Sequence, residues 1–210
     1  MKKTACFLSG AVLALVLLLT AVLIPALSTQ RFQAALVNTV DQQALGVSEG
    51  DLSAFAEETM RYLRSEKDAW EPRIPHEGVS EAFRIHMAEV RGWVSAAPWV
   101  IGLGVIAGIA LLWLGGFLRK QALLGVAALL GVLAVILLWA AVDFASFWMV
   151  LHQWFIPGGI FSAHEAVMSL FPLELFFGYI PAVCLWAALL LGALCAGMWF
   201  SLKNDQRTKA

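Results

Sequence analysis

Two of the four histidines stand in sequence contexts that could support acid–base chemistry. His86 is followed three residues later by Glu89, a spacing that brings both side chains to one face of a helix. His152 lies in an aromatic stretch that begins at Asp143 and leads on to Glu165. Imidazoles exchange protons near neutral pH, and a neighbouring carboxylate can hold one in the right tautomer. We therefore predict a two-histidine site, His86 and His152, supported by Asp143, Glu89 and Glu165.

These residues also have simpler explanations. A histidine and a glutamate three residues apart often make only a surface contact, and aromatic residues with a few polar neighbours are typical of a membrane interface. A metal site could combine His86, His152 and His164 with carboxylates, but no spacing such as H-E-x-x-H supports it. The three cysteines lie in apolar runs, so a cysteine nucleophile is not indicated. We expect neither a metal nor a cofactor.

Composition places this site in a membrane protein. The 210 residues are 60% hydrophobic and 14% charged, with a mean hydropathy of +0.78, whereas a soluble domain carries about a quarter charged residues. We predict an all-α membrane protein with four transmembrane helices and a small, mainly helical extracytoplasmic cap between the first two. The predicted segments are helix 1 (1–28), the cap (29–97), helix 2 (98–118), helix 3 with an extension (121–151), an outer loop (152–175), helix 4 (176–202) and a tail (203–210).

The first apolar run is interpreted as a signal anchor that stays on the protein. It extends from Ala5 to Leu27 and follows Lys2 and Lys3. A spanning helix needs about 20 apolar residues, whereas the apolar region of a signal peptide has about 7–15. The alternative is cleavage near Ser28, because Ala-Leu-Ser at that point resembles a cleavage site.

The cap is predicted to contain two helices. In the first, Ser48 to Arg64, the apolar residues recur at helical spacing. The second opens at Ser80 and carries His86, whose face also includes Phe83 and Trp93. The apolar stripe of the first helix consists of Leu52, Phe55, Ala56, Met60 and Leu63.

The basic residues predict the orientation in the membrane. Outside the cap, lysine and arginine occur only at the N-terminus, between helices 2 and 3, and in the tail. Four spans put these three places on one side, which the positive-inside rule makes cytoplasmic. The cap and the 152–175 loop then share the outer face, where His86 and His152 could meet. The net acidic cap gives no support for nucleic-acid binding.

The residues around the two histidines resemble the bacterial lipoprotein intramolecular transacylase family, whose members have four spans and an outer globular segment. The family's His-Met-x-Asp-Val motif is matched by His86-Met87-Ala88-Glu89-Val90, with Glu89 in place of Asp. A family helix ending in Tyr-Leu is matched at Tyr62-Leu63, which makes Tyr62 a further supporting residue. The second family motif is matched by Asp143-Phe144, Phe147, His152, Phe155, Pro157, Glu165, Phe171-Pro172 and Phe176-Phe177.

The resemblance implies an acyl migration within one substrate, a lipoprotein whose N-terminal cysteine carries a diacylglyceryl group. The sn-2 acyl chain would move to the cysteine α-amine and give a lyso-form lipoprotein. His86 and His152 would transfer the protons, and the membrane would be the bacterial cytoplasmic membrane with both termini cytoplasmic. Lipoprotein and membrane lipid would be the partners.

Two other classes of function stay open from the sequence. One is a non-enzymatic membrane partner or sensor whose cap binds a ligand. The other is a different membrane enzyme, such as a lipid hydrolase or a metallopeptidase, which would release fatty acid or peptide or depend on a metal. The sequence also leaves open which of the two histidines is the base.

Overall fold

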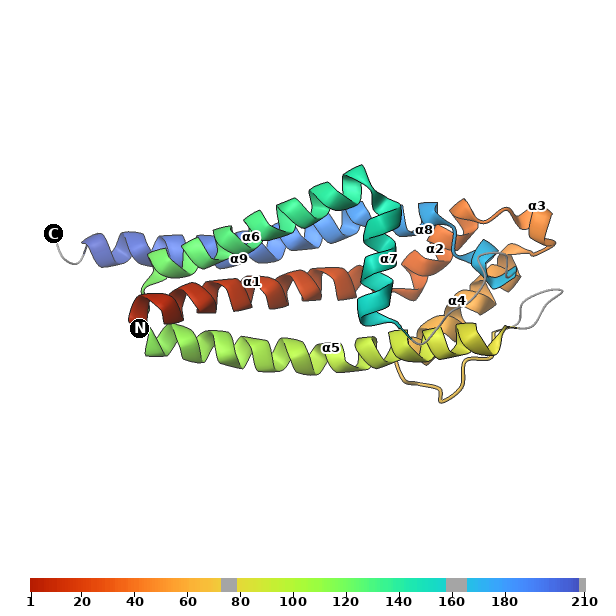
Figure 1. Cartoon of the computed structure of the whole chain (residues 1–210), viewed down its shortest axis with the longest axis horizontal. Coiled ribbons are helices and arrows are strands. Elements are labelled where there is room, and N and C mark those ends of the chain that lie inside the picture. Colours follow the sequence, from red (N-terminus) through yellow and green to blue (C-terminus); the bar gives the residue numbers. More distant parts are fainter. Residues whose placement is uncertain (73–78, 158–165, 208–210) are drawn as a thin grey trace. The chain divides into compact units, whose positions relative to one another are not determined.

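The computed structural model describes residues 1–72, 79–157 and 166–207. Within these ranges every regular element is helical, which confirms the predicted all-α class (Figure 1). The helices are α1 (Lys2–Ala26), α2 (Thr29–Thr39), α3 (Gln42–Leu45), α4 (Glu49–Leu63), α5 (Glu81–Leu114), α6 (Arg119–Val142), α7 (Phe144–Phe155), the 3-10 segment η1 (Ala166–Leu170), α8 (Leu173–Phe177) and α9 (Ile180–Arg207).

The chain forms two compact units. We call residues 1–22, 97–149 and 184–210 the span unit, and residues 23–96 and 150–183 the cap unit. In the part of the chain that the structure describes, four helices are long and apolar enough to cross a membrane, namely α1, α5, α6 and the 180–200 part of α9. The predicted number of spans is therefore confirmed. The division into the predicted segments stays a prediction.

Helix α5 joins a polar part and an apolar part without a break. The sequence predicted a helix opening at Ser80 and a separate span from 98 to 118, but the structure has one helix with Pro98 inside it. Its 34 residues correspond to about 51 Å, whereas the hydrocarbon core of a bilayer is about 30 Å thick. The charged residues of α5 all lie in 81–96, so this part lies outside the apolar span.

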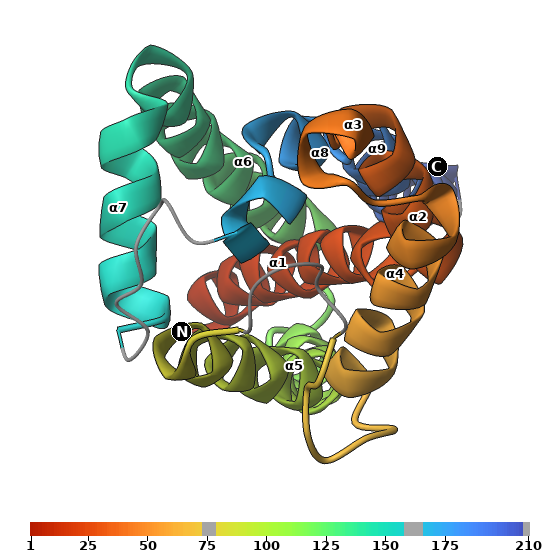
Figure 2. The same cartoon turned by 90° about the vertical axis from the view of Figure 1, so that its right-hand side faces the viewer.

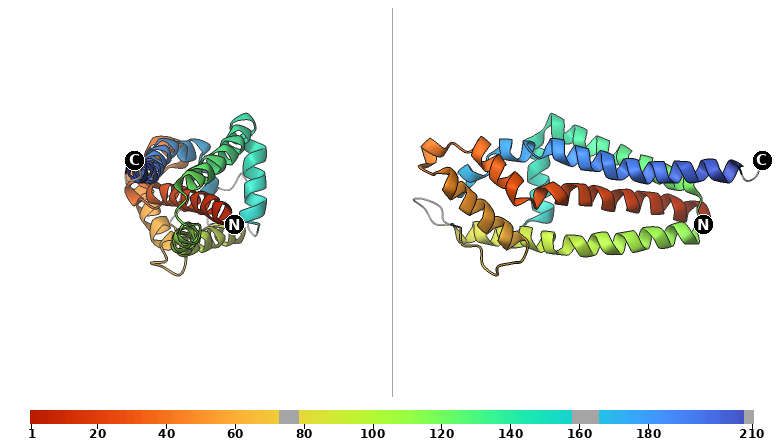
Figure 3. Two further views of the ribbon diagram at one scale, coloured as in Figure 1. Left: turned by 90° about the vertical axis from the view of Figure 1, so that its left-hand side faces the viewer. Right: turned by 180° about the vertical axis from the view of Figure 1, so that it is seen from behind.

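Helix α1 packs closely against both α5 and α6 in the span unit, and it lies between them in Figures 1 and 3. A Cβ atom on Gly108 of α5 would lie 2.6 Å from the Leu13 side chain, and one on Gly125 of α6 would collide with the backbone carbonyl of Phe7. The Ser9 hydroxyl donates a hydrogen bond of 2.6 Å to the Gly108 carbonyl. Small residues therefore set the distance between the helices, as in other membrane bundles.

The cap unit has an aromatic core built by α2, α4 and the segments that follow them. Ser48 and Asp51 form a capping box that begins α4, and every residue of the predicted apolar stripe of this helix is buried. Helix α2 lies beside both α4 and α8 (Figure 2). The Phe55 ring lies 6.3 Å from Phe32, 6.2 Å from Trp70 and 5.8 Å from Phe171.

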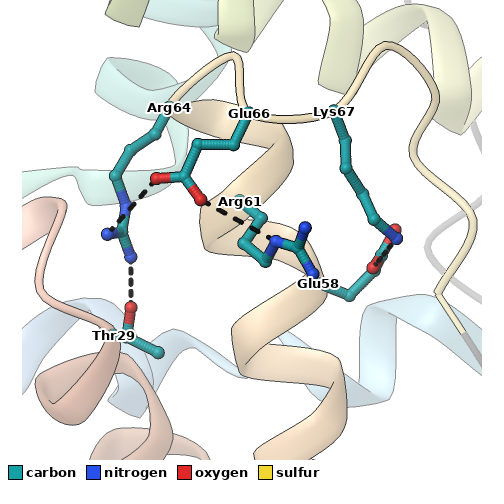
Figure 4. Close-up of polar contacts among 6 residues, drawn as sticks. All are labelled: Thr29, Glu58, Arg61, Arg64, Glu66 and Lys67. Atoms are coloured by element: carbon teal, nitrogen blue, oxygen red, sulfur yellow. Dashed lines mark hydrogen bonds and ion pairs between the residues drawn. The ribbon is translucent and has the colours of Figure 1, made fainter.

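Polar contacts hold the segment after α4 against that helix (Figure 4). Most of these side chains are partly exposed, and an exposed ion pair contributes only about 0–1 kcal/mol. They therefore orient this segment more than they stabilise it. The contacts join Arg64 to Thr29 and to Glu66 (3.7 Å), Arg61 to Glu66 (3.8 Å), and Lys67 to Glu58.

The extension expected after the third span is a helix of its own. The 121–151 segment was predicted as one helix with an extension, but α6 ends at Val142 and α7 begins at Phe144 in a different direction (Figure 1). Asp143 between them has φ −144° and ψ 80°, outside the helical region. His152 therefore lies on a separate helix, α7, which begins after the N-cap residue Asp143.

The segment predicted as an outer loop and the start of the fourth span also contains more elements than expected. In the described part of 152–175, η1 and the start of α8 follow α7. The chain then turns at Gly178 before α9 begins at Ile180, four residues after the predicted start of the span. Pro181 therefore lies in the first turn of α9, where proline is tolerated.

We predict that Gly125→Ala lowers the midpoint of thermal unfolding of the protein in detergent micelles. The added methyl group collides with the Phe7 carbonyl of α1, and such overpacking costs about 1–3 kcal/mol. Gly131→Ala on the same helix is the matched control, because nothing lies within 4 Å of its Cβ position. Equal midpoints for the two variants would contradict the close α1–α6 contact.

Candidate active site

His86 lies at the edge of the aromatic core of the cap unit. The Ser80 hydroxyl accepts the Phe83 N–H at 3.1 Å and so begins α5. One turn later, the His86 side chain is 9% exposed and its ring lies 5.6 Å from the Phe83 ring. Phe83 in turn lies 5.5 Å from Trp70 and 5.9 Å from Phe171. His86 is thus the polar end of a continuous aromatic cluster.

His152 lies beside His86, as the sequence analysis anticipated. The centroids of the two imidazole rings are 5.7 Å apart and the ring planes differ by 4°. His152 is half-buried and lies in the last turn of α7. Both residues belong to the cap unit, although they are 66 positions apart in the chain. The two rings are close enough to act on neighbouring atoms of one substrate.

The environment keeps His86 uncharged. Burial lowers the pKa of the His86 imidazole below its ordinary value of 6.5, and the charge of protonated His152 lowers it further, while the Glu89 carboxylate opposes both effects. Burial and the neighbouring His152 therefore both favour the neutral form of the His86 imidazole.

The predicted supporting residues have different surroundings. Glu89 is half-buried and interacts electrostatically with His86. Asp143 belongs to the span unit, where its carboxylate accepts the backbone N–H of Ser146 at 3.0 Å and caps α7. Hydrogen bonds from the side chain and then the backbone of Ser146 lower the pKa of Asp143. Glu165, like His164, lies outside the described residues.

Tyr62 is buried next to the loop that follows α4. The guanidinium of Arg91 lies 4.8 Å from the centre of the Tyr62 ring, a cation–π contact. Arg91 also donates to the Ser65 hydroxyl at 3.3 Å and to the Asp68 carbonyl at 3.1 Å. Tyr62 therefore helps to attach this loop to α5 at Arg91, which lies eight residues after Phe83 and five residues after His86.

A metal centre was one alternative for the histidines. Among residues 1–72, 79–157 and 166–207, no three His, Cys, Asp or Glu side chains are grouped so that they could hold an ion. His86 and His152 are thus a pair within the part of the chain that the structure describes.

Comparison with known proteins assigns the family. The family model described as lipoprotein intramolecular transacylase, Lit, matches residues 7–159 of this chain. The chain belongs to the Lit family. It is therefore an acyltransferase that acts on lipoproteins, and the non-enzymatic and hydrolytic alternatives are set aside.

Solved Lit structures share the fold. The membrane integral Lit from Bacillus cereus superposes with a TM-score of 0.73 at 15% identity, covering 99% of this chain and 96% of that one. Two variants of that protein, with one histidine replaced by arginine or by alanine, give TM-scores of 0.76 and 0.74 at 14% and 16% identity. The first covers 100% of this chain and 95% of that one, and the second 99% and 96%. No curated protein matches the chain.

One contact near His86 and His152 was not predicted from the sequence. The Trp93 indole N–H donates a hydrogen bond of 2.6 Å to the Phe155 carbonyl, and the two rings meet edge to face at 5.5 Å. The sequence placed Trp93 on the His86 face of its helix and Phe155 among the aromatics near His152. A pairing between residues 62 positions apart requires the tertiary structure.

We predict that His152→Phe raises the pKa of His86. Phenylalanine keeps an aromatic ring of similar size but removes the positive charge that disfavours protonation of His86. The measurement is an NMR titration of histidine-labelled protein, in which single substitutions assign the four signals.

Glu89→Gln is the control, because it should change the pKa of His86 in the opposite direction. Removing this carboxylate takes away the charge that favours the protonated imidazole, so the pKa of His86 should fall. If both variants moved the pKa in the same direction, the electrostatic account of this site would be wrong.

Proposed function

We propose that the protein moves the sn-2 acyl chain of a diacylglyceryl-cysteine to the α-amine of the same cysteine. The amine nitrogen attacks the ester carbonyl, an N–C bond forms, and the C–O bond to glycerol breaks. The amine loses one proton and the glycerol oxygen gains one, so no co-reactant is needed. The product is an N-acyl, S-monoacylglyceryl lipoprotein, the lyso-form.

The close approach of His86 and His152 is the observation that carries this proposal. An acyl shift needs one group that takes a proton from the nitrogen and one that gives a proton to the departing oxygen. Two imidazoles with centroids 5.7 Å apart can reach two such atoms of a single substrate. Because both reacting groups belong to one molecule, orientation supplies much of the remaining acceleration.

We assign the proton-accepting role to His86. Its burial and the neighbouring His152 keep it neutral, which is the form that accepts a proton. His152 is more exposed, and we assign to it the delivery of a proton to the glycerol oxygen. Glu89 would orient His86. Supporting roles for Asp143, Glu165 and Tyr62 stay predictions.

The reaction would take place at the outer face of the bacterial cytoplasmic membrane. The grouping of lysine and arginine outside the cap favours cytoplasmic termini and an extracytoplasmic site. The acyl chains would then stay in the lipid beside the aromatic residues of α7, while the ester and amine reach the histidines.

We predict that His86→Ala and His152→Ala each lower the rate of lyso-form production by about 100- to 10,000-fold, the usual contribution of a general acid or base. Mass spectrometry of lipoprotein N-termini measures the product. Ile85→Ala and Gln153→Ala are the matched controls, because both residues are exposed neighbours of the two histidines. Persistence of the lyso-form at the parental rate in both histidine variants would overturn the proposal.

The two roles predict different responses to pH. The substrate amine has a pKa of about 7.7–8.0, so it is neutral without help above about pH 9. The rate deficit of His86→Ala should therefore shrink between about pH 7 and pH 9.5, whereas the deficit of His152→Ala should not. Initial rates across this range test the assignment. The reverse pattern would exchange the two roles.

A further inference from the structure

The C-terminal end of α7 is held by a side chain from α5. The last carbonyl groups of a helix have no partner within that helix. In α7, the His152 carbonyl accepts the N–H of Ile156 at 2.8 Å, and the Phe155 carbonyl accepts the Trp93 indole N–H at 2.6 Å. Both the end of α7 and the first part of α5 belong to the cap unit, where Figure 2 shows them meeting.

The two contacts between α5 and α7 lie on matching faces. His86 and Trp93 are seven residues apart, nearly two full helical turns, so they point to the same side of α5. His152 and Phe155 are three residues apart, about one turn of α7. One contact is between the imidazole rings of His86 and His152. The other is between the Trp93 indole and Phe155 at the end of α7.

Two separate contacts fix the orientation of α7 against α5 more fully than a single contact does. The imidazole pair alone would leave α7 able to rotate about that point. The contact at Trp93 lies about 10 Å further along α5, at about 1.5 Å per residue, and so sets the angle of the α7 terminus as well as its distance. A polar hydrogen bond adds direction, because the indole has only one N–H to donate.

We propose that Trp93 is a positioning residue for the two-histidine site: its indole N–H holds the last carbonyl of α7 and thereby keeps His152 beside His86. The inference rests on the proposed function, since it assigns Trp93 to the geometry of the same site. Trp93 does not need to touch substrate for this role. It acts by limiting how far the half-buried His152 ring can move from the buried His86 ring.

Trp93→Phe tests this role, because it removes the hydrogen-bond donor and keeps an aromatic ring against Phe155. We expect the rate of lyso-form production to fall about 10- to 100-fold, as expected when a reacting group is misplaced by about 1 Å. We also expect the pKa of His86 to rise toward its value in His152→Phe, since His152 would lie further away. Trp99→Phe is the control, a residue on the same helix whose side chain is 76% exposed.

The outcomes separate this inference from the proposed function. A parental rate and a parental His86 pKa in Trp93→Phe would overturn the positioning role, while His86→Ala and His152→Ala could still abolish activity. A raised pKa with a parental rate would keep the positioning role and overturn the two-histidine mechanism. A lower rate with a parental pKa would overturn the positioning role as well, because the distance between the imidazoles would be unchanged.

Discussion

Helix α5 is longer than the apolar layer that it must cross, and the site depends on this excess length. About 20 residues span the hydrocarbon core of a bilayer, whereas α5 has 34. The surplus, residues 81–96, carries charged side chains and cannot be covered by lipid. One face of this part is buried against the aromatic core of the cap unit, and His86 lies on that face.

Burial by aromatic rings has a chemical consequence. His86 is buried with its ring next to Phe83, which itself packs on Trp70 and Phe171, and an imidazole loses its charge more readily where water is excluded. The proposed acyl shift needs a neutral base, and the burial of His86 favours the neutral imidazole.

The order of the helices shows how a membrane bundle and a small core can share elements. Gly108 and Gly125 let α1 approach its neighbours in the span unit, where packing depends on small residues because lipid is as apolar as the helices. The cap unit is stabilised differently, by the burial of large aromatic side chains away from water. Residues 81–96 of α5 pack in the cap unit, and residues 97–114 of the same helix pack in the span unit.

Much of this could be predicted from residue types and spacing. The four spans follow from runs of apolar residues, and α4 follows from the recurrence of Leu52, Phe55 and Met60, because both signals are local in the chain. The break at Asp143 was missed because its flanking residues are apolar on both sides. The structure explains it: the Asp143 carboxylate accepts the Ser146 N–H and begins a new helix.

The sequence by itself determined that this is a helical membrane protein with two histidines in motifs that resemble one family. The tertiary structure decided that the two rings lie 5.7 Å apart, that His86 is buried, and that Trp93 reaches the Phe155 carbonyl. Periodicity places a residue on a face of its own helix, but it contains no information on which residue of a distant helix it meets. That pairing depends on how the aromatic core packs as a whole.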